Sequence, residues 1–499
     1  MGAPSNVSAL SAGEKIFFAV FAGALVLAVF AFEFVRPYLY LAPDSFTYFT
    51  MARQFHDTGL LFSYSGIDHT TGVHPGYYFF LMLLYPLFGH ALPAWSFFIN
   101  GLVLLAGIIV LSRAAGTVPA ALVLLAAMTP YGVSLTNNGM ESSLLFLGLS
   151  LFAAFFLRNP DAWSAGIDSR PTQAFLLGLI LGGIVFSRLD AFFLVLGLYA
   201  VLFFKSGYAS GWRVSWVQKM TRTFFFISLP LAAVLLIVFS MNFHYGGSIL
   251  PVSGHLKSSF PSVSPGWFQN LLHLKTFALS VVVLGLYLLR EFLKRRYLGI
   301  LIPTLFLASL GLYLYNAFFV SDIGAWYGTL PFFSLSFVGA LWLAEYIPRV
   351  TDFFRIHSSI FLPALFTVLC IAVVWAHVSF AGPNWISPHE DAARFLAAKA
   401  ETGEAAGELK DGVFAFYASM PVYNLTGLAN NAGYIDALRS GNISGYFEAR
   451  RIRYVVGGTF GSGVQVSGSR IDFSACSDPI YDTGIVRIYG TASCFSGRL

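Results

Sequence analysis

Long apolar runs recur along the first 382 residues and are separated by short polar segments. A helix that crosses the hydrocarbon core of a bilayer needs about 20 consecutive apolar residues. The pattern therefore predicts an α-helical polytopic membrane protein with about eleven transmembrane helices. The runs that meet or nearly meet this length are 16–35, 94–112, 117–133, 141–157, 172–187, 190–204, 222–242, 271–289, 297–319, 326–346 and 358–379.

A twelfth apolar run, residues 76–92, is shorter and contains Pro86, Gly89 and His90. We interpret it as one helix lying in the membrane interface, because proline and glycine interrupt a helix of spanning length. If this run crosses the membrane instead, the N-terminus and the loop 36–75 change sides and the later loops do not.

The sequence becomes polar from about residue 383, with clusters of Gly, Asn and Ser. Runs such as 454–458 (YVVGG) and 485–490 (IVRIYG) are typical of strands. We therefore divide the chain into a transmembrane catalytic domain, 1–382, and a C-terminal mixed α/β soluble domain, 383–499.

Composition supports the membrane class: 57% of the 499 residues are hydrophobic and only 11% are charged. Soluble domains contain about 25% charged residues. The mean hydropathy is +0.71. The sequence has no basic stripe, zinc-ligand spacing or nucleic-acid motif, so we expect no nucleic-acid partner.

Lysine and arginine concentrate in the segments 205–222, 290–297 and 348–355. Cytoplasmic loops of membrane proteins carry an excess of these residues. With eleven spans, this places the N-terminus in the cytoplasm and the C-terminal domain outside an inner (cytoplasmic) membrane. Cys476 and Cys494 would then face an oxidising compartment and could form a disulfide; otherwise they are free thiols.

The distinctive polar motifs fall in the loops assigned to the outer face: PDSFTYF, HTTGVHPG, NNGME, SRLD, HYGGSILPVSGHLK and SDIGAWY. Ionisable residues near membrane depth are functional candidates. The motifs cluster at one face rather than at the bilayer midplane, and the two halves show no internal repeat. Both features argue against a secondary transporter, which stays an alternative.

Taken in order, these motifs resemble the GT-C superfamily of membrane glycosyltransferases, especially its arabinofuranosyltransferase- and mannosyltransferase-like members. The resemblance rests on an acid after the first span and on the segments 139–157, 186–202, 243–257 and 419–456. It implies transfer of a sugar from a polyprenyl-phosphate donor to a hydroxyl of a glycan, lipid or protein acceptor at the outer face, with no cofactor. A lipid-linked oligosaccharide ligase is the nearest alternative within this resemblance.

Asp44 is the first catalytic candidate, because glycosyl transfer needs a base that takes the proton of the acceptor hydroxyl. Pro43-Asp44-Ser45 is also good capping sequence, so Asp44 could instead cap a helix over 45–56.

A lipid-phosphate leaving group calls for nearby cations. Lys257 is the first candidate for binding the donor phosphate and Arg188 the second. Lys257 could instead be an ordinary interfacial lysine, and Arg188 could pair with Asp190 at a helix break.

The remaining substrate-binding candidates lie in the same set of loops. Glu141 begins a helix, where the dipole alone would favour an acid. Histidines and acids show no short ligand spacing, so we expect no metal site. Aromatic residues could stack on a sugar or belong to the interfacial aromatic belt. These candidates are Glu141, Asp190, His74, His244, Tyr245, Trp326 and Tyr327.

Overall fold

The computed structural model describes residues 12–159, 171–210, 214–264, 266–294, 299–320, 323–354, 358–409, 412–458, 464–466, 469–471, 476 and 478–494. The chain forms two compact units, and each unit combines segments that are distant in the sequence. The first unit comprises Met1–Val35, Phe97–Leu235 and Ser262–Ala381. The second comprises Arg36–Ser96, Leu236–Pro261 and Gly382–Leu499, so two loops of the membrane part join the C-terminal segment.

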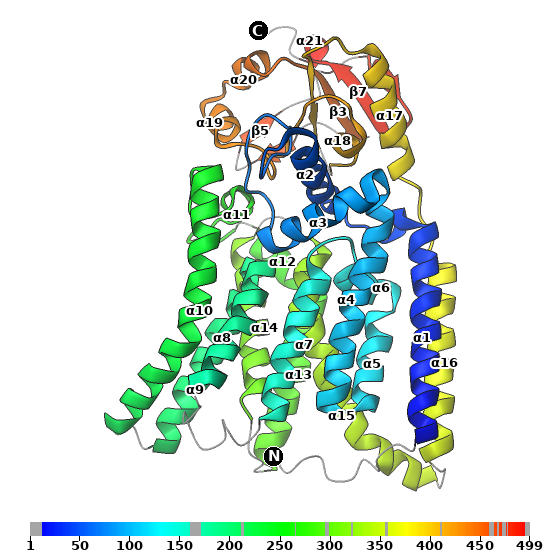
Figure 1. Ribbon diagram of the computed structural model, residues 1–499, viewed down its shortest axis with the longest axis vertical. Coiled ribbons are helices and arrows are strands. Elements are labelled where there is room, and N and C mark those ends of the chain that lie inside the picture. The colour runs from blue at the N-terminus through cyan, green and yellow to red at the C-terminus, as the bar shows by residue number, and fades with distance from the viewer. Residues whose placement is uncertain are drawn as a thin grey trace. The chain divides into compact units, whose positions relative to one another are not determined.

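The first unit is a bundle of long helices that run side by side (Figure 1). Helix α1 packs on α16, α9 on α14, α7 on α8, and α13 on both α14 and α15. The helices are α1 (Ala12–Val35), α4 (Leu92–Ala115), α5 (Thr117–Ala127), α6 (Pro130–Thr136), α7 (Ser142–Arg158), α8 (Pro171–Ser187), η4 (Leu189–Ala191), α9 (Phe192–Ser210), α10 (Val214–Gly246), α12 (Trp267–His273), α13 (Lys275–Leu293), α14 (Leu301–Phe319), η5 (Ala325–Gly328), α15 (Thr329–Phe354) and α16 (Ser358–Ser379). Helix α4 begins, and α10 ends, in segments that belong to the second unit.

Among the described residues, eight helical stretches are long and apolar enough to cross a membrane. The bent pair α5–α6 can form a ninth, and α7 and α8 are apolar helices of 17 residues each. Each of the eleven predicted runs overlaps one of these helical stretches, which confirms the class of α-helical polytopic membrane protein; residues 297 and 298 of the run 297–319 lie outside the described residues. The run 76–92 forms α3 (Pro75–Phe88) and η2 (Gly89–Ala91), directly followed by α4. Alone, the 14 residues of α3 would cover about 21 Å, less than the roughly 30 Å of a hydrocarbon core.

The bend between α5 and α6 is 93° and has a local cause. Thr129 caps α6 by accepting a hydrogen bond from the Gly132 amide, and Pro130 follows at the first helical position. Proline lacks an amide proton and cannot continue the preceding helix. A ring nitrogen of His377 on α16 lies 2.7 Å from the Met128 carbonyl oxygen, so this buried carbonyl has a partner at the break.

The second unit contains the shorter elements. They are η1 (Pro37–Leu39), α2 (Ser45–Thr58), α3, η2, α11 (Val252–Lys257), α17 (Ile386–Lys399), β1 (Ala405–Glu408), α18 (Val413–Tyr417), β2 (Val422–Asn424), α19 (Ala432–Ser440), α20 (Ile443–Ala449), β3 (Ile452–Gly458), β4 (Val464–Val466), β5 (Ser469–Ile471), β6 (Tyr481–Asp482), β7 (Val486–Gly490) and α21 (Thr491–Cys494).

Five of these strands form one mixed sheet with the order β2-β1-β3-β7-β6. Strand β1 pairs in parallel with β2 and β3, whereas β7 runs antiparallel to β3 and β6. The predicted strand runs 454–458 and 485–490 are confirmed as β3 and β7, and they pair directly, with Tyr454 opposite Gly490. The mixed α/β character of the C-terminal part is therefore confirmed.

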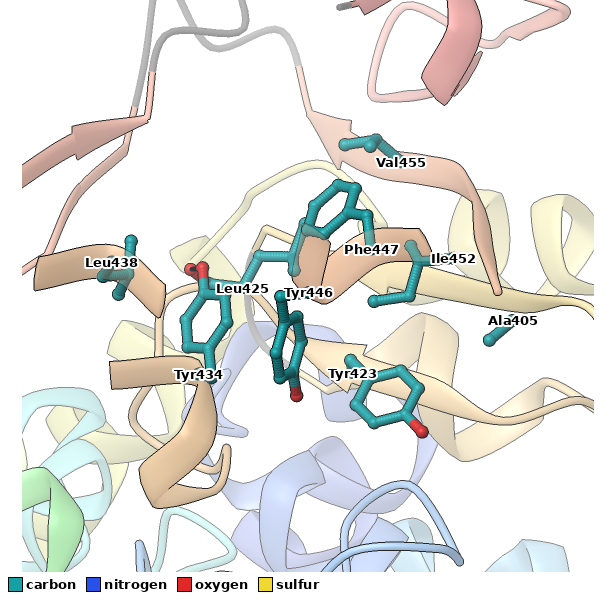
Figure 2. Close-up of a cluster of buried hydrophobic side chains, with 9 residues drawn as sticks. All are labelled: Ala405, Tyr423, Leu425, Tyr434, Leu438, Tyr446, Phe447, Ile452 and Val455. Atoms are coloured by element: carbon teal, nitrogen blue, oxygen red, sulfur yellow. Dashed lines mark hydrogen bonds between the residues drawn. The ribbon is translucent and has the colours of Figure 1, made fainter. Parts of the chain in front are cut away.

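One face of this sheet is covered by α19 and α20, which bury an aromatic core (Figure 2). Tyr434 and Tyr446 pack with ring centroids 5.2 Å apart, and Tyr446 lies edge-on to Tyr423 at 6.1 Å. Burial raises the pKa of Tyr423 to about 12, so it stays a neutral phenol at physiological pH. Cys476 and Cys494 form a disulfide at the end of the chain.

Candidate active site

Asp44 and Lys257 come together within the second unit. Asp44 immediately precedes α2, and Lys257 is the last residue of α11. The Lys257 ammonium lies 3.9 Å from Asp44 Oδ2, and the side chains are 12% and 33% exposed. At this separation the ion pair is loose, because the two groups are too far apart for a direct hydrogen bond. Asp44 also occupies the N-cap position of α2, but its carboxylate makes no capping hydrogen bond there.

His74 lies close to the same helix. It is the N-cap residue of α3, and its backbone amide donates a hydrogen bond to the Tyr48 hydroxyl at 3.1 Å. Tyr48 is buried and lies one helical turn after Asp44 on α2. Residues four apart share a face of an α-helix. His74 therefore belongs to the loop that borders the Asp44 face of α2.

Tyr245 and His244 lie at the C-terminal end of α10, also in the second unit. The Tyr245 ring packs 5.1 Å from both the Phe62 and His69 rings. His244 is exposed and stands edge-on to Tyr245, with ring centroids 4.7 Å apart. The contacts of Tyr245 therefore join the end of α10 to the loop 59–74.

The other predicted site residues meet in the first unit, around the guanidinium of Arg188. Its Nε and one Nη bind both carboxylate oxygens of Asp190, at 2.7 and 3.0 Å. The other Nη donates to Glu141 Oε1 at 3.1 Å and to the Trp326 carbonyl at 2.8 Å. The Arg188 guanidinium lies over the Tyr327 ring, with the guanidinium carbon 4.7 Å from the ring centroid. The starts of three helices, α7, η4 and η5, thus meet at the Arg188 guanidinium. We call the five residues of this site the Arg188 cluster: Glu141, Arg188, Asp190, Trp326 and Tyr327.

This cluster is closed. Arg188 and Glu141 are only 2% and 1% exposed, and Asp190 is 18% exposed. An arginine carries five N–H donors. Four of them bind protein oxygens of the described residues, so Arg188 has little capacity left to clamp a phosphate. Lys257, the other predicted phosphate-binding cation, is 12% exposed and lies farther from its carboxylate partner than Arg188 does from Asp190 and Glu141.

Polar contacts that the local sequence does not reveal connect the loop 59–74 to the C-terminal segment. Asp68 binds the Arg450 guanidinium at 2.7 and 3.2 Å and the Asn431 amide at 2.8 Å. Asp68 and Arg450 are 382 positions apart in the sequence, and no local pattern links them. Beside Asp68 lies a small hollow that is lined also by Tyr64, His69 and Asn430.

Among the residues that the structure describes, no group of three or more His, Cys, Asp or Glu side chains could hold a metal ion. The candidate chemistry of the Asp44–Lys257 pair is that of a carboxylate beside an ammonium group. A carboxylate can accept a proton, and an ammonium group can bind an anionic oxygen.

No protein-family model matches the chain, and no curated protein matches its sequence significantly. Solved structures do match. The ArnT protein of Cupriavidus metallidurans, solved bound to undecaprenyl phosphate, superimposes with a TM-score of 0.54 over 96% of this chain and 98% of its own, at 14% identity. Its apo state gives 0.54 over 98% and 100%, at 13% identity. An Archaeoglobus fulgidus oligosaccharyltransferase tethered to an acceptor peptide gives 0.49 over 89% and 69%, at 13% identity.

The match to ArnT covers nearly the whole of both chains, so it includes elements of both units rather than the helix bundle alone. At such low identity it establishes the fold and leaves the activity to be argued from the residues of this chain. The chain shares its fold with ArnT, which is a GT-C glycosyltransferase, and the resemblance predicted from the ordered motifs is thereby confirmed at the level of fold.

Proposed function

We propose that this protein transfers a sugar from a polyprenyl-phosphate donor to a hydroxyl group of a glycan, lipid or protein acceptor at the outer face of the membrane. The observation that carries the proposal is the approach of Lys257 to Asp44, whose carboxylate does not cap α2. The fold adds support, because the structural neighbour ArnT was solved with undecaprenyl phosphate.

In the proposed reaction, the acceptor hydroxyl oxygen attacks the anomeric carbon of the donor sugar. Its proton passes to the Asp44 carboxylate as the new carbon–oxygen bond forms. The bond between the anomeric carbon and the phosphate oxygen breaks, and polyprenyl phosphate departs with the bonding electron pair. Lys257 stabilises the negative charge that develops on this phosphate.

The loose pair suits both roles. In this proposal Lys257 turns from Asp44 to the donor phosphate when the donor binds, and Asp44 then faces the acceptor hydroxyl. A tight, bidentate ion pair such as Arg188–Asp190 would have to be broken first. In this proposal the Arg188 cluster instead fixes the starts of three helices in the membrane unit.

The test is sugar transfer by the purified protein in lipid. A panel of radiolabelled polyprenyl-monophosphate sugars is incubated with the protein, and both the labelled acceptor and the released polyprenyl phosphate are measured. Asp44→Asn at equal folding is the control, because an amide cannot take the proton. Transfer that disappears in this variant supports the proposal. Transfer that requires diphosphate-linked oligosaccharides would favour a ligase, and no transfer from any donor would contradict the enzyme assignment.

We further propose that the protein is integral to an inner (cytoplasmic) membrane and that its C-terminal segment lies outside the cytoplasm. The Cys476–Cys494 disulfide supports this placement, because disulfides persist in oxidising compartments. After mild reduction of intact cells, a membrane-impermeant maleimide should label the parent protein and not Cys476→Ser/Cys494→Ser. Labelling only after the cells are opened would reverse the proposed orientation. The double substitution should also lower the stability of this segment by about 3 kcal/mol.

A further inference from the structure

Helix α2, which begins just after Asp44, is held by backbone carbonyls around α18 in the same unit. One Nη of Arg53 donates to the carbonyls of Phe416 and Ala418, at 2.6 and 2.8 Å. Thr50, nearly one turn earlier, donates to the Gly412 carbonyl at 3.1 Å. Arg53 is 5% exposed. Burial lowers the pKa of the Arg53 guanidinium and nearby Asp57 raises it, which leaves it a charged donor at neutral pH.

The first turn of α2 is also fixed by packing. Phe46 is fully buried and stands edge-on to Trp385 and Phe416, with ring centroids 5.9 and 5.8 Å apart. Gly412 has a φ of +77°, and a Cβ atom there would lie 2.8 Å from the Thr47 backbone nitrogen. The C-terminal segment therefore touches the backbone of α2 three residues after Asp44, where only glycine fits.

Lys257 is tied to the same segment through two adjacent threonines. Thr70 donates a hydrogen bond to the Asn430 carbonyl at 2.8 Å. Thr71 accepts one at 3.3 Å from the amide of Val252, the first residue of α11, which ends at Lys257. A Cβ atom on neighbouring Gly72 would lie 1.7 Å from the Leu428 carbonyl oxygen. The HTTG motif, residues 69–72, thus lies directly between the segment 428–430 and α11.

A buried carboxylate anchors the start of this loop. Glu408 at the end of β1 is 2% exposed and accepts a hydrogen bond from the Tyr64 hydroxyl at 2.9 Å. It also accepts from the backbone amides of Phe414 and Ala415, each at 3.1 Å. These amides belong to α18, which holds α2. The Glu408 carboxylate therefore connects the loop 59–74 to α18, which in turn contacts α2.

We propose that the C-terminal segment positions the Asp44–Lys257 pair, with Arg53 fixing the Asp44 side and Thr71 the Lys257 side. The proposal rests on the function proposed for that pair. It gives the C-terminal segment a part in the reaction beyond binding an acceptor. Arg53 and Thr71 touch neither donor nor acceptor in this account and act as positioning residues.

The physical reason is that neither short helix can hold its end residue alone. Helix α11 has six residues, and isolated helices of this length are unstable in water. Its position therefore depends on contacts such as Thr71 to Val252. Transfer requires Asp44 and Lys257 to be correctly placed relative to the substrates. A displacement of about 1 Å in either group can reduce the transfer rate by roughly 100-fold.

The experiment measures the approach of the two side chains without relying on sugar transfer. A water-soluble carbodiimide activates the Asp44 carboxylate, the Lys257 amine attacks it, and an amide forms as the activating group leaves as a urea. Mass spectrometry of the digested protein quantifies this zero-length cross-link. We compare the parent with Arg53→Lys, which retains the charge but loses the guanidinium fork, and with Thr71→Val, which retains the shape but loses the acceptor.

Two matched controls accompany these variants. Arg394→Lys changes an arginine whose side chain is 72% exposed on α17, and Thr71→Ser retains the hydroxyl. We expect the cross-link in the parent and both controls and a severalfold lower yield in Arg53→Lys and Thr71→Val at equal thermal stability. In the transfer assay, kcat should fall by roughly 10- to 100-fold in the two variants, with a smaller change in KM for the acceptor.

The outcomes separate this inference from the proposed function. If the variants lose the cross-link and no chain transfers sugar, the positioning role stands and the transfer reaction fails. If the parent transfers sugar and Arg53→Lys and Thr71→Val cross-link normally, the transfer reaction stands and the positioning role is overturned. A parent protein that forms no Asp44–Lys257 cross-link contradicts the approach itself and overturns the inference.

Discussion

The Asp44–Lys257 pair and the Arg188 cluster use the same kinds of groups in opposite ways. Each pairs a cationic side chain with one or more carboxylates. In the first unit Arg188 is almost completely buried, and four of its donors bind protein oxygens. In the second unit Lys257 lies 3.9 Å from a carboxylate that is one-third exposed. A saturated cluster stabilises a structure, whereas a loosely paired one can exchange its partner for a substrate. Our proposal that the chemistry belongs to the second unit rests on this difference.

The comparison predicts a large loss of stability on breaking the closed cluster. Arg188→Met leaves the buried Glu141 carboxylate and Asp190 without their cation. Removing one partner of a buried ion pair costs about 3–5 kcal/mol, so we expect a strong fall in the thermal midpoint of the detergent-purified protein. Arg394→Met, at an exposed position, is the matched control and should leave the midpoint within about 1 °C of the parent. Equal midpoints in both variants would show that the cluster does not stabilise the first unit.

The opposite result is expected at the Asp44–Lys257 pair, where a substitution should change stability little and sugar transfer strongly. Lys257→Met removes a weak, partly exposed pair, and such pairs contribute only about 0–1 kcal/mol to stability. Transfer should nevertheless fall roughly 100-fold, the effect of losing one group that stabilises developing charge. Lys257→Arg should restore part of the rate. A Lys257→Met protein that melts early and transfers sugar normally per folded molecule would remove Lys257 from the proposed site.

A smaller effect is expected at a third polar site, inside the first unit. Glu33 on α1 is fully buried and accepts a hydrogen bond from Asn137 at 2.9 Å, while its other oxygen has no hydrogen-bond partner among the described residues. Glu33→Gln can keep the Asn137 bond and offer its amide protons to the Asn137 side-chain oxygen, which has no hydrogen-bond partner in the described part of the chain. We expect Glu33→Gln to match or exceed the parent in thermal stability.

Glu33→Ala is the contrasting variant. It leaves the buried Asn137 amide with only the Phe97 carbonyl, at 3.3 Å, and should cost about 1–3 kcal/mol. Neither variant should change transfer per folded molecule, because the Glu33 carboxylate binds Asn137 inside the first unit, whereas the proposed chemistry belongs to the second. A specific loss of transfer in Glu33→Gln would extend the functional site into the membrane unit.

Local sequence patterns were sufficient for the elements and insufficient for their partners. Apolar runs of spanning length predicted the membrane helices, because a backbone in lipid must satisfy its hydrogen bonds internally. The β-rich runs 454–458 and 485–490 predicted β3 and β7. Nothing local could join Asp68 to Arg450 or Tyr64 to Glu408, since these pairs are 382 and 344 positions apart. The grouping of two membrane-part loops with the C-terminal segment depends on such long-range contacts.

The candidate residues show the same limit. Their chemical type and outer-loop position singled out Arg188, Glu141 and Asp190, but sequence could not decide between ligand contact and mutual pairing. The structure pairs them with one another. For Asp44, sequence allowed both a helix cap and a catalytic base, because capping depends on backbone angles and side-chain rotamer. Arg53 gave no sequence signal for its hydrogen bonds to Phe416 and Ala418, since both acceptors are backbone carbonyls far along the chain.

The most direct test of the central claim compares Asp44→Asn with Glu141→Gln in one single-turnover assay. Both changes replace a carboxylate by an amide of the same shape, one in the open pair and the other in the closed cluster. Loss of a general base reduces a rate by about 10²–10⁴-fold. We predict this loss for Asp44→Asn and near-parent transfer for folded Glu141→Gln. Normal transfer by Asp44→Asn together with loss in Glu141→Gln would move the chemistry to the Arg188 cluster and contradict the account.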